Sequence, residues 1–228
     1  MLSIVIPTYN EAGSIPLLAE RLHGALAGRE WELIVVDDGS PDGTADIAAA
    51  LAPRIPVRVV RRAGKAGLAS AVVAGFDAAG GDVLLVMDAD LSHPPEVVPA
   101  LADAIANGAD LAVGSRYVKG GAVMDWPLKR RVVSRLACLM GNALVPVRDA
   151  TSGFFALRRS VIDGVRLNPI GFKIGFEVIA RGNYRKVVEV PYTFRDRELG
   201  ASKFGRREIV QYVVQLGQVA RDKAMRRI

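Results

Sequence analysis

The 228-residue sequence contains a single cysteine, Cys138, so no disulfide bond can form within the chain. This excludes a small secreted domain that depends on disulfides and favours a reducing compartment, the cytoplasm. No apolar run reaches the roughly 18 residues of a transmembrane helix, and no basic segment precedes the first apolar run. We therefore expect neither a membrane span nor a secretory signal.

Aromatic residues are also scarce, at 6% of the sequence. A module that binds nucleic acid by stacking bases on aromatic side chains is therefore not expected. Positive charge is in excess, because 30 lysines and arginines against 24 acidic residues give a net charge of +6. Basic residues are densest after Arg116, at 129–135, 195–207 and 221–227. This distribution indicates an anionic partner, such as a membrane surface or a phosphorylated substrate.

Apolar runs alternate with segments of helical spacing in the first half of the chain. Strands are predicted at 2–7, 32–38, 57–61, 82–87 and 111–113, and helices at 14–27, 44–51 and 67–79. Because these strands are apolar without strict alternation, both faces of the sheet should be covered. The predicted fold class is α/β, with a mostly parallel, Rossmann-like sheet and helices on both faces.

The second half is less regular. Amphipathic helices are predicted at 129–145 and 208–224, and strands at 153–157 and 187–194. No internal repeat or low-complexity segment divides the chain. We therefore expect one domain over residues 1–228, with residues 206–228 as an amphipathic helical appendage.

Polar clusters follow three of the predicted strands: residues 7–11, Asp37-Asp38 and Asp88-Ala89-Asp90. Ligands of parallel α/β sheets bind beyond the carboxyl ends of the strands, so these clusters should converge on one site. The carboxylates of Asp88 and Asp90 are the hard ligands that Mg²⁺ or Mn²⁺ prefers, and a diphosphate would complete the shell. The competing interpretation is a pair of solvated carboxylates that cap the next helix.

Two weaker signals leave alternatives open. Asp37-Asp38 either accepts hydrogen bonds from a nucleotide base or only begins a loop rich in turn residues. Gly64-Lys65-Ala66-Gly67 either turns its amides toward a phosphate or only allows close packing of the next helix, and it lacks P-loop and dinucleotide-fold spacing.

Taken in order, the motifs resemble family 2 glycosyltransferases of the GT-A fold, and within them the dolichyl-phosphate (polyprenyl-phosphate) mannose synthases. The stretches that carry the resemblance cover nearly the whole chain: residues 7–11, 37–44, 87–96, 114–117, 126–135, 151–154 and 196–203. Ala69 and Phe155 depart from it, because relatives often have glycine and arginine there. Some relatives also have membrane helices after the catalytic domain, so this chain is either of the soluble catalytic type or a fragment.

The resemblance implies inverting transfer of mannose from GDP-mannose to dolichyl or polyprenyl phosphate, giving polyprenyl β-D-mannosyl phosphate and GDP. Residues 1–115 would form the nucleotide-sugar half and residues 116–205 the acceptor half. The implied guanosine contacts are Pro7, Tyr9, Glu11, Val36 and Asp38. Asp88, Ala89 and Asp90 would hold metal and diphosphate, with Ser92 near the metal. Arg116 and Arg130 would bind the acceptor phosphate, and Arg197 and Lys203 would close over both substrates.

The distribution of charged residues, with carboxylates in the first half and arginines in the second, suits this reaction. A phosphate monoester is already ionised near neutral pH, with a second pKa of about 6, so it needs no strong general base. Orientation by arginine matters more, since the planar guanidinium matches phosphate oxygens. A lipid substrate further implies a peripheral location on the cytoplasmic face of a membrane, helped by the amphipathic segments 129–145 and 207–224 or by a membrane-anchoring partner protein. The alternative is that both segments are ordinary helices that pack their apolar faces on the domain.

Three other functions compete with this interpretation. Asp88-Ala89-Asp90-Leu91-Ser92 resembles the nucleophile motif of haloacid-dehalogenase phosphohydrolases, but that motif normally follows the first strand and here follows the fourth. A basic nucleic-acid-binding module lacks its aromatic platform. A polyprenyl-phosphate glucosyltransferase that uses UDP-glucose is the alternative within the transferases.

Overall fold

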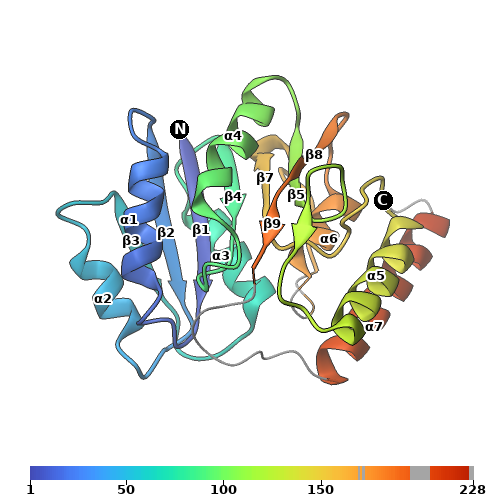
Figure 1. The fold of residues 1–228 in the computed structure, drawn as a ribbon, viewed down its shortest axis with the longest axis horizontal. Coiled ribbons are helices and arrows are strands. Elements are labelled where there is room, and N and C mark those ends of the chain that lie inside the picture. The colour runs from blue at the N-terminus through green and yellow to red at the C-terminus, as the bar shows by residue number, and fades with distance from the viewer. Residues whose placement is uncertain (169, 171–172, 196–205, 226–228) are drawn as a thin grey trace.

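The computed structural model describes residues 1–168, 170, 173–195 and 206–225 (Figure 1). Within these residues, seven strands form one sheet in the order β3-β2-β1-β4-β7-β5-β8. They are β1 (Leu2–Thr8), β2 (Trp31–Asp37), β3 (Val57–Arg61), β4 (Val83–Val86), β5 (Leu111–Ser115), β7 (Phe155–Arg158) and β8 (Val187–Pro191). A separate pair joins β6 (Ala122–Val123) to β9 (Thr193–Phe194).

Helices cover both faces of the sheet. They are α1 (Ile15–Ala25), α2 (Thr44–Ala50), α3 (Leu68–Ala78), α4 (Val98–Ala106), α5 (Leu128–Asn142), α6 (Ile174–Arg181) and α7 (Arg206–Ala224). Strand β1 shows how the layers form: Ile4 and Ile6 pack with α1, α2 and α4, whereas Val5 packs with α3 and α6 on the opposite face. Helix α3 approaches β1 closely, because a Cβ at Gly75 would lie only 2.2 Å from Val5 Cγ1.

The predicted α/β class is confirmed, with a mostly parallel sheet, helices on both faces and a C-terminal amphipathic helix. Strand β7 is the exception, since it runs antiparallel to both β4 and β5. The single strand predicted at 187–194 is divided. Residues 187–191 pair with β5, and residues 193–194 pair with β6. Pro191 lies at the division, where it has no backbone N–H to extend the ladder.

Two helices lie outside the predicted set, α4 and α6. In α6 every residue from Ile174 to Ala180 is buried. No polar face therefore marks the helical period in the sequence, and a short apolar run of this kind cannot be told from a strand.

Helices α5 and α7 lie side by side at one end of the molecule (Figure 1). The Tyr212 hydroxyl donates to the Ala137 carbonyl (3.0 Å), and Lys223 Nζ donates to the Leu144 carbonyl (2.5 Å). Both helices also present large apolar side chains to solvent: Leu128, Val132, Val133, Leu136, Leu139, Met140, Ile209, Val210, Val213 and Val214. None of the helices in the described ranges combines the length and hydropathy that a membrane span requires.

Candidate active site

Residues 88–93, here called the acidic loop, follow β4 at the carboxyl edge of the sheet. Asp90 is buried, and its Oδ1 accepts hydrogen bonds from the Ser92 backbone N–H (3.1 Å) and hydroxyl (2.6 Å). Leu91 has a positive φ of 61°, a conformation that costs a non-glycine residue about 1–3 kcal/mol. The Asp88 side chain is 39% exposed. The loop is therefore a strained, hydrogen-bonded turn with one partly exposed carboxylate.

His93 fixes the start of this loop. Its Nδ1 accepts the Asp88 backbone N–H at 3.0 Å, so the ring proton must sit on Nε2 when the imidazole is neutral. Burial lowers the pKa of His93 below its usual value, although the nearby carboxylates of Asp88 and Asp90 oppose that shift. The ring stacks on Phe154 with centroids 4.9 Å apart, and Tyr192 lies edge-on to it. His93 therefore acts as a neutral acceptor.

The segment 149–154 brings the second half of the chain to the acidic loop. A Cβ at Gly153 would lie 3.6 Å from His93 Cε1 and 4.0 Å from Asp88 Oδ1. At the other end of the segment, Asp149 is fully buried and contacts Arg116. One short segment therefore passes beside the acidic loop and also binds Arg116, the first of the predicted acceptor arginines.

Arg116 follows β5 and is clamped by Asp149. The Arg116 Nε and backbone N–H donate to Asp149 Oδ2 at 2.7 and 2.9 Å, and one terminal nitrogen donates to Oδ1 at 2.6 Å. The same nitrogen donates to Thr151 Oγ1 at 2.9 Å. Burial opposes the charge of the guanidinium, but Asp149 more than offsets it, and the pKa of Arg116 is raised. The guanidinium thus stays charged in one fixed orientation.

Arg130, in the first turns of α5, reaches the same region by a different contact. Its guanidinium carbon lies 4.1 Å from the centroid of the Trp126 ring, and that of Arg116 lies 5.6 Å from the same ring. Trp126 is buried. The structure thus places Arg116 and Arg130 near one indole ring, so the two predicted acceptor arginines lie close together.

Lys173 is a charged residue near the site that sequence reasoning missed. Its Nζ donates to the Thr151 carbonyl at 2.7 Å. Burial and the neighbouring Arg116 lower the pKa of Lys173 to about 8, while Asp149 and Asp88 act in the opposite sense. No motif surrounds this lysine in the sequence, so only its three-dimensional position reveals it.

The predicted nucleotide side lies at the ends of β1 and β2. Pro7 is half-buried on β1 and Val36 is buried on β2. Lys65 Nζ lies 4.4 Å from the centroid of the Tyr9 ring. Glu11 accepts the Ser14 hydroxyl at Oε2 (3.1 Å).

Asp38 has a local structural role in this region. Its Oδ2 accepts the backbone N–H groups of Ala66 and Gly67, both at 3.0 Å, and Arg62 lies 2.9 Å from its Oδ1. The two amides of the 64–67 loop that were candidates for a phosphate therefore point at Asp38.

The residue types of the acidic loop fit a hard divalent cation. Among the described residues, no group of three or more His, Cys, Asp or Glu side chains is arranged to hold a metal ion. Asp88 and Asp90 offer two carboxylates, and the Nδ1 of His93 is occupied by the Asp88 amide. Mg²⁺ is commonly held by one or two carboxylates plus substrate phosphates and water, so two carboxylates suffice if a diphosphate is present. Arg197 and Lys203 lie outside the described residues.

Comparison with known proteins identifies the family. The model of glycosyl transferase family 2 matches residues 3–166 of the chain. The chain belongs to glycosyltransferase family 2. The dolichol-phosphate mannosyltransferase of Pyrococcus furiosus is 51% identical over 215 residues, which cover 92% of this chain and 61% of that protein. The polyprenol monophosphomannose synthase of Mycolicibacterium smegmatis is 46% identical over 212 residues, 88% of this chain and 79% of that protein. These matches confirm the resemblance read from the motifs.

The fold of this family 2 member has solved counterparts. Glucosyl-3-phosphoglycerate synthase from Mycobacterium tuberculosis, crystallised with Mn²⁺, UDP-glucose and phosphoglyceric acid, superimposes with a TM-score of 0.69. The identity is 22%, over 95% of this chain and 80% of that chain. The two chains therefore share the GT-A fold.

Proposed function

We propose that the protein transfers mannose from GDP-mannose to dolichyl or polyprenyl phosphate, with inversion at the anomeric carbon. One observation carries the proposal: the segment 149–154 passes beside Asp88 at Gly153, where an added Cβ would lie 4.0 Å from the Asp88 carboxylate, and it holds Arg116 through Asp149. An acidic site suited to a metal diphosphate and a basic site suited to a phosphate thus meet at one segment. The mannosyl donor and lipid acceptor are proposed from the names and identities of the relatives.

The reaction needs a nucleophile, a leaving group and their alignment. An oxygen of the acceptor phosphate forms a bond to the anomeric carbon while the bond from that carbon to GDP breaks. The bond electrons leave with GDP, and no proton must be removed because the phosphate is already ionised at neutral pH. In-line attack opposite the diphosphate gives polyprenyl β-D-mannosyl phosphate.

Residues 1–115 form the donor side in this proposal. Pro7, Tyr9, Glu11, Val36 and Asp38 bind guanosine, and the Asp88-Ala89-Asp90 loop binds the diphosphate with Ser92 beside it. Mg²⁺ or Mn²⁺ bound there supplies a Lewis acid for the charge that develops on GDP. His93 holds the Asp88 amide in place, and Lys173 adds a positive charge near the diphosphate.

Residues 116–205 form the acceptor side. Arg116, oriented by Asp149, and Arg130, packed on Trp126, bind the phosphate and keep its attacking oxygen in line. Arg197 and Lys203 complete the proposed set by closing over donor and acceptor. Residues 206–228 are the helical appendage of what we take to be one domain.

A lipid acceptor requires contact with a membrane. Helices α5 and α7 present apolar side chains to solvent, with Leu128 78% and Val210 61% exposed, and basic residues occupy both helices. Such amphipathic helices bind in the plane of the membrane interface. We place them on the cytoplasmic face as a peripheral attachment, with a membrane-anchoring protein as a further partner.

A donor panel tests the proposed function. The purified protein, with Mg²⁺ or Mn²⁺, is given GDP-mannose, UDP-glucose or neither, together with a short polyprenyl phosphate in detergent. We expect mannosylated lipid and a higher thermal midpoint with GDP-mannose alone. Glucosyl transfer from UDP-glucose would replace the mannose assignment with the glucosyltransferase alternative, and release of inorganic phosphate without sugar transfer would favour a phosphohydrolase.

A further inference from the structure

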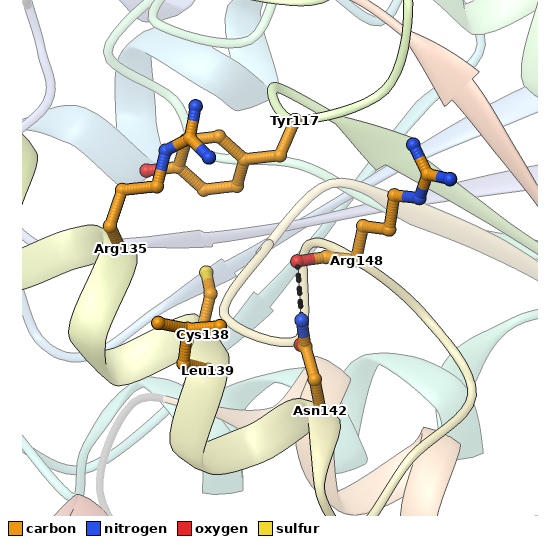
Figure 2. A pocket seen from close by; sticks show the side chains of 6 residues that line it. All are labelled: Tyr117, Arg135, Cys138, Leu139, Asn142 and Arg148. Atoms are coloured by element: carbon orange, nitrogen blue, oxygen red, sulfur yellow. Dashed lines mark hydrogen bonds between the residues drawn. The ribbon is translucent and has the colours of Figure 1, made fainter.

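A small cavity lies beside helix α5, next to the proposed acceptor site. Tyr117, Arg135, Cys138, Leu139, Asn142 and Arg148 line it, and its volume is about 220 Å³ (Figure 2). Pockets for drug-sized ligands span roughly 300–1,000 Å³, so this cavity is too small for a sugar nucleotide. A phosphate group with a few attached atoms matches it better.

The charge of the cavity is positive. Arg135 and Arg148 approach it from two segments, helix α5 and the segment after it (Figure 2), and no carboxylate is among its lining residues. Within the described chain the guanidinium of Arg148 makes no hydrogen bond or ion pair, and that of Arg135 lies 4.8 Å from the Tyr117 ring centroid. Two guanidinium groups of this kind suit an anion with several oxygens.

Two carboxylates near the cavity, those of Asp149 and Glu189, accept hydrogen bonds from donors other than Arg135 and the Arg148 guanidinium. Asp149 binds Arg116, as described above. Glu189 accepts the backbone N–H groups of Arg148 (2.8 Å) and Asp149 (3.1 Å). Asn142 Nδ2 donates to the Arg148 carbonyl at 3.3 Å. These bonds fix the Arg148 backbone at the cavity, and the Arg148 side chain extends from there on the side away from Arg135 (Figure 2).

The position of the cavity points to the source of the anion. Leu139 lines the cavity and is also 63% exposed on the apolar face of α5, together with Leu136 and Met140. An occupant therefore meets positive charge inside the cavity and an apolar surface at its edge. A phospholipid has this combination, with an anionic phosphate next to acyl chains.

We propose that the cavity binds the phosphate head group of an anionic phospholipid in the membrane on which α5 docks. The lining residues do not include Arg116 or Arg130, so the site is separate from the proposed acceptor site. The inference rests on the proposed membrane docking and is independent of sugar transfer. Its effect is to hold helix α5, and with it Arg130, at a defined height relative to the bilayer.

Vesicle sedimentation tests this site without any sugar donor. The full chain is incubated with vesicles of phosphatidylcholine alone, or of phosphatidylcholine containing phosphatidylglycerol. We expect Arg148→Gln and Arg135→Gln each to reduce binding to the anionic vesicles about tenfold, because each removes charge-assisted hydrogen bonds. Lys129→Gln removes a charge from the same helix outside the cavity, and should reduce binding no more than about fivefold. Binding to neutral vesicles should be the same for all four proteins.

Three controls keep the outcome decisive. Thermal midpoints should match the wild type, since both arginines are exposed. Transfer to a short polyprenyl phosphate in detergent should be unchanged in both arginine variants, so failure of that assay in the wild type refutes the proposed function without touching this site. Glycerol 3-phosphate should compete with anionic vesicles for the wild type and for Lys129→Gln, but not for the two arginine variants. Equal losses in Arg148→Gln and Lys129→Gln, or competition by soluble phosphate without any preference for anionic vesicles, would overturn the proposal.

Discussion

The two halves of the molecule hold their functional side chains in different ways. In residues 1–115, the carboxylates of Asp38 and Asp90 are held by backbone amides and a hydroxyl close by in the fold. In residues 116–225, Arg116 is held by a buried carboxylate and Arg130 by the face of an indole ring. The first arrangement relies mainly on neutral donors, although Arg62 also lies beside Asp38, and the second uses a fully buried ion pair and an aromatic contact.

This difference predicts different sensitivities. A carboxylate held by backbone amides keeps its position when neighbouring side chains change. A buried ion pair fails when either partner is lost, because the remaining charge stays buried without compensation. We therefore expect substitutions on the donor side to reduce activity and leave stability unchanged. Substitutions around Asp149 should reduce both activity and stability.

The largest effect on transfer is expected from Asp88→Asn. The change removes one anionic ligand from the proposed cation, and a metal contributes several kcal/mol of charge stabilisation in the transition state. We expect the transfer rate to fall by about 10³-fold or more. The thermal midpoint should change little, because the Asp88 side chain is 39% exposed. Transfer within tenfold of the wild type would show that the cation is held elsewhere.

Asp149→Asn should have the largest effect on stability. It leaves the guanidinium of Arg116 buried without its anion, so the free energy of unfolding should fall by about 3–5 kcal/mol. Asp103→Asn is the matched change in the first half, where Asp103 pairs with Arg29 on the surface. That pair should contribute less than about 1 kcal/mol. Urea unfolding of both variants measures the two changes in the free energy of unfolding. Equal losses of stability in the two variants would refute the contrast between the halves.

Arg130→Ala should separate acceptor binding from donor binding. Arg130 packs on Trp126 beside Arg116. In the proposed acceptor site its guanidinium binds the phosphate, so its loss should remove charged hydrogen bonds to that phosphate. We expect the KM for polyprenyl phosphate to rise about 10- to 100-fold, with the Kd for GDP unchanged by calorimetry. Lys129→Ala, on the same helix, serves as the control. A parallel loss of GDP affinity would place Arg130 on the donor side.

The smallest predicted effect is that of His93→Phe. Phenylalanine keeps a ring against Phe154 but cannot accept the Asp88 N–H, so one buried amide loses its partner. We expect the affinity for GDP with Mg²⁺ to fall about fivefold. His93→Asn, whose side-chain oxygen can accept the same N–H, should recover part of the loss. If both variants bind GDP equally, the hydrogen bond does not position the loop.

The comparison between halves also explains what the sequence could predict. The acidic loop and the strand ends before it were predictable, because each combines an apolar run with polar residues that are adjacent in the chain. The contact between Arg116 and Asp149 spans 33 positions, and no local pattern marks it. Helix α6 was missed because it is buried on all sides. Lys173 reaches the site from a segment without a motif.

Contacts between residues that are distant in the sequence therefore position the functional side chains of the second half. The arginines themselves were predictable from charge and from the family resemblance. Their support by Asp149 and Trp126 required the structure. The implied roles of Arg197 and Lys203 remain predictions, since both residues lie outside the described part of the chain.

The most direct test of the account compares two acceptors that differ only in their head group. GDP-mannose and Mg²⁺ are supplied with either polyprenyl phosphate or the corresponding polyprenol, and the mannosylated lipid is measured. The arginines of the second half predict product from the phosphate alone, with a β linkage at the anomeric carbon. Comparable transfer to the polyprenol, or an α-linked product, would contradict the assignment of a phosphate nucleophile.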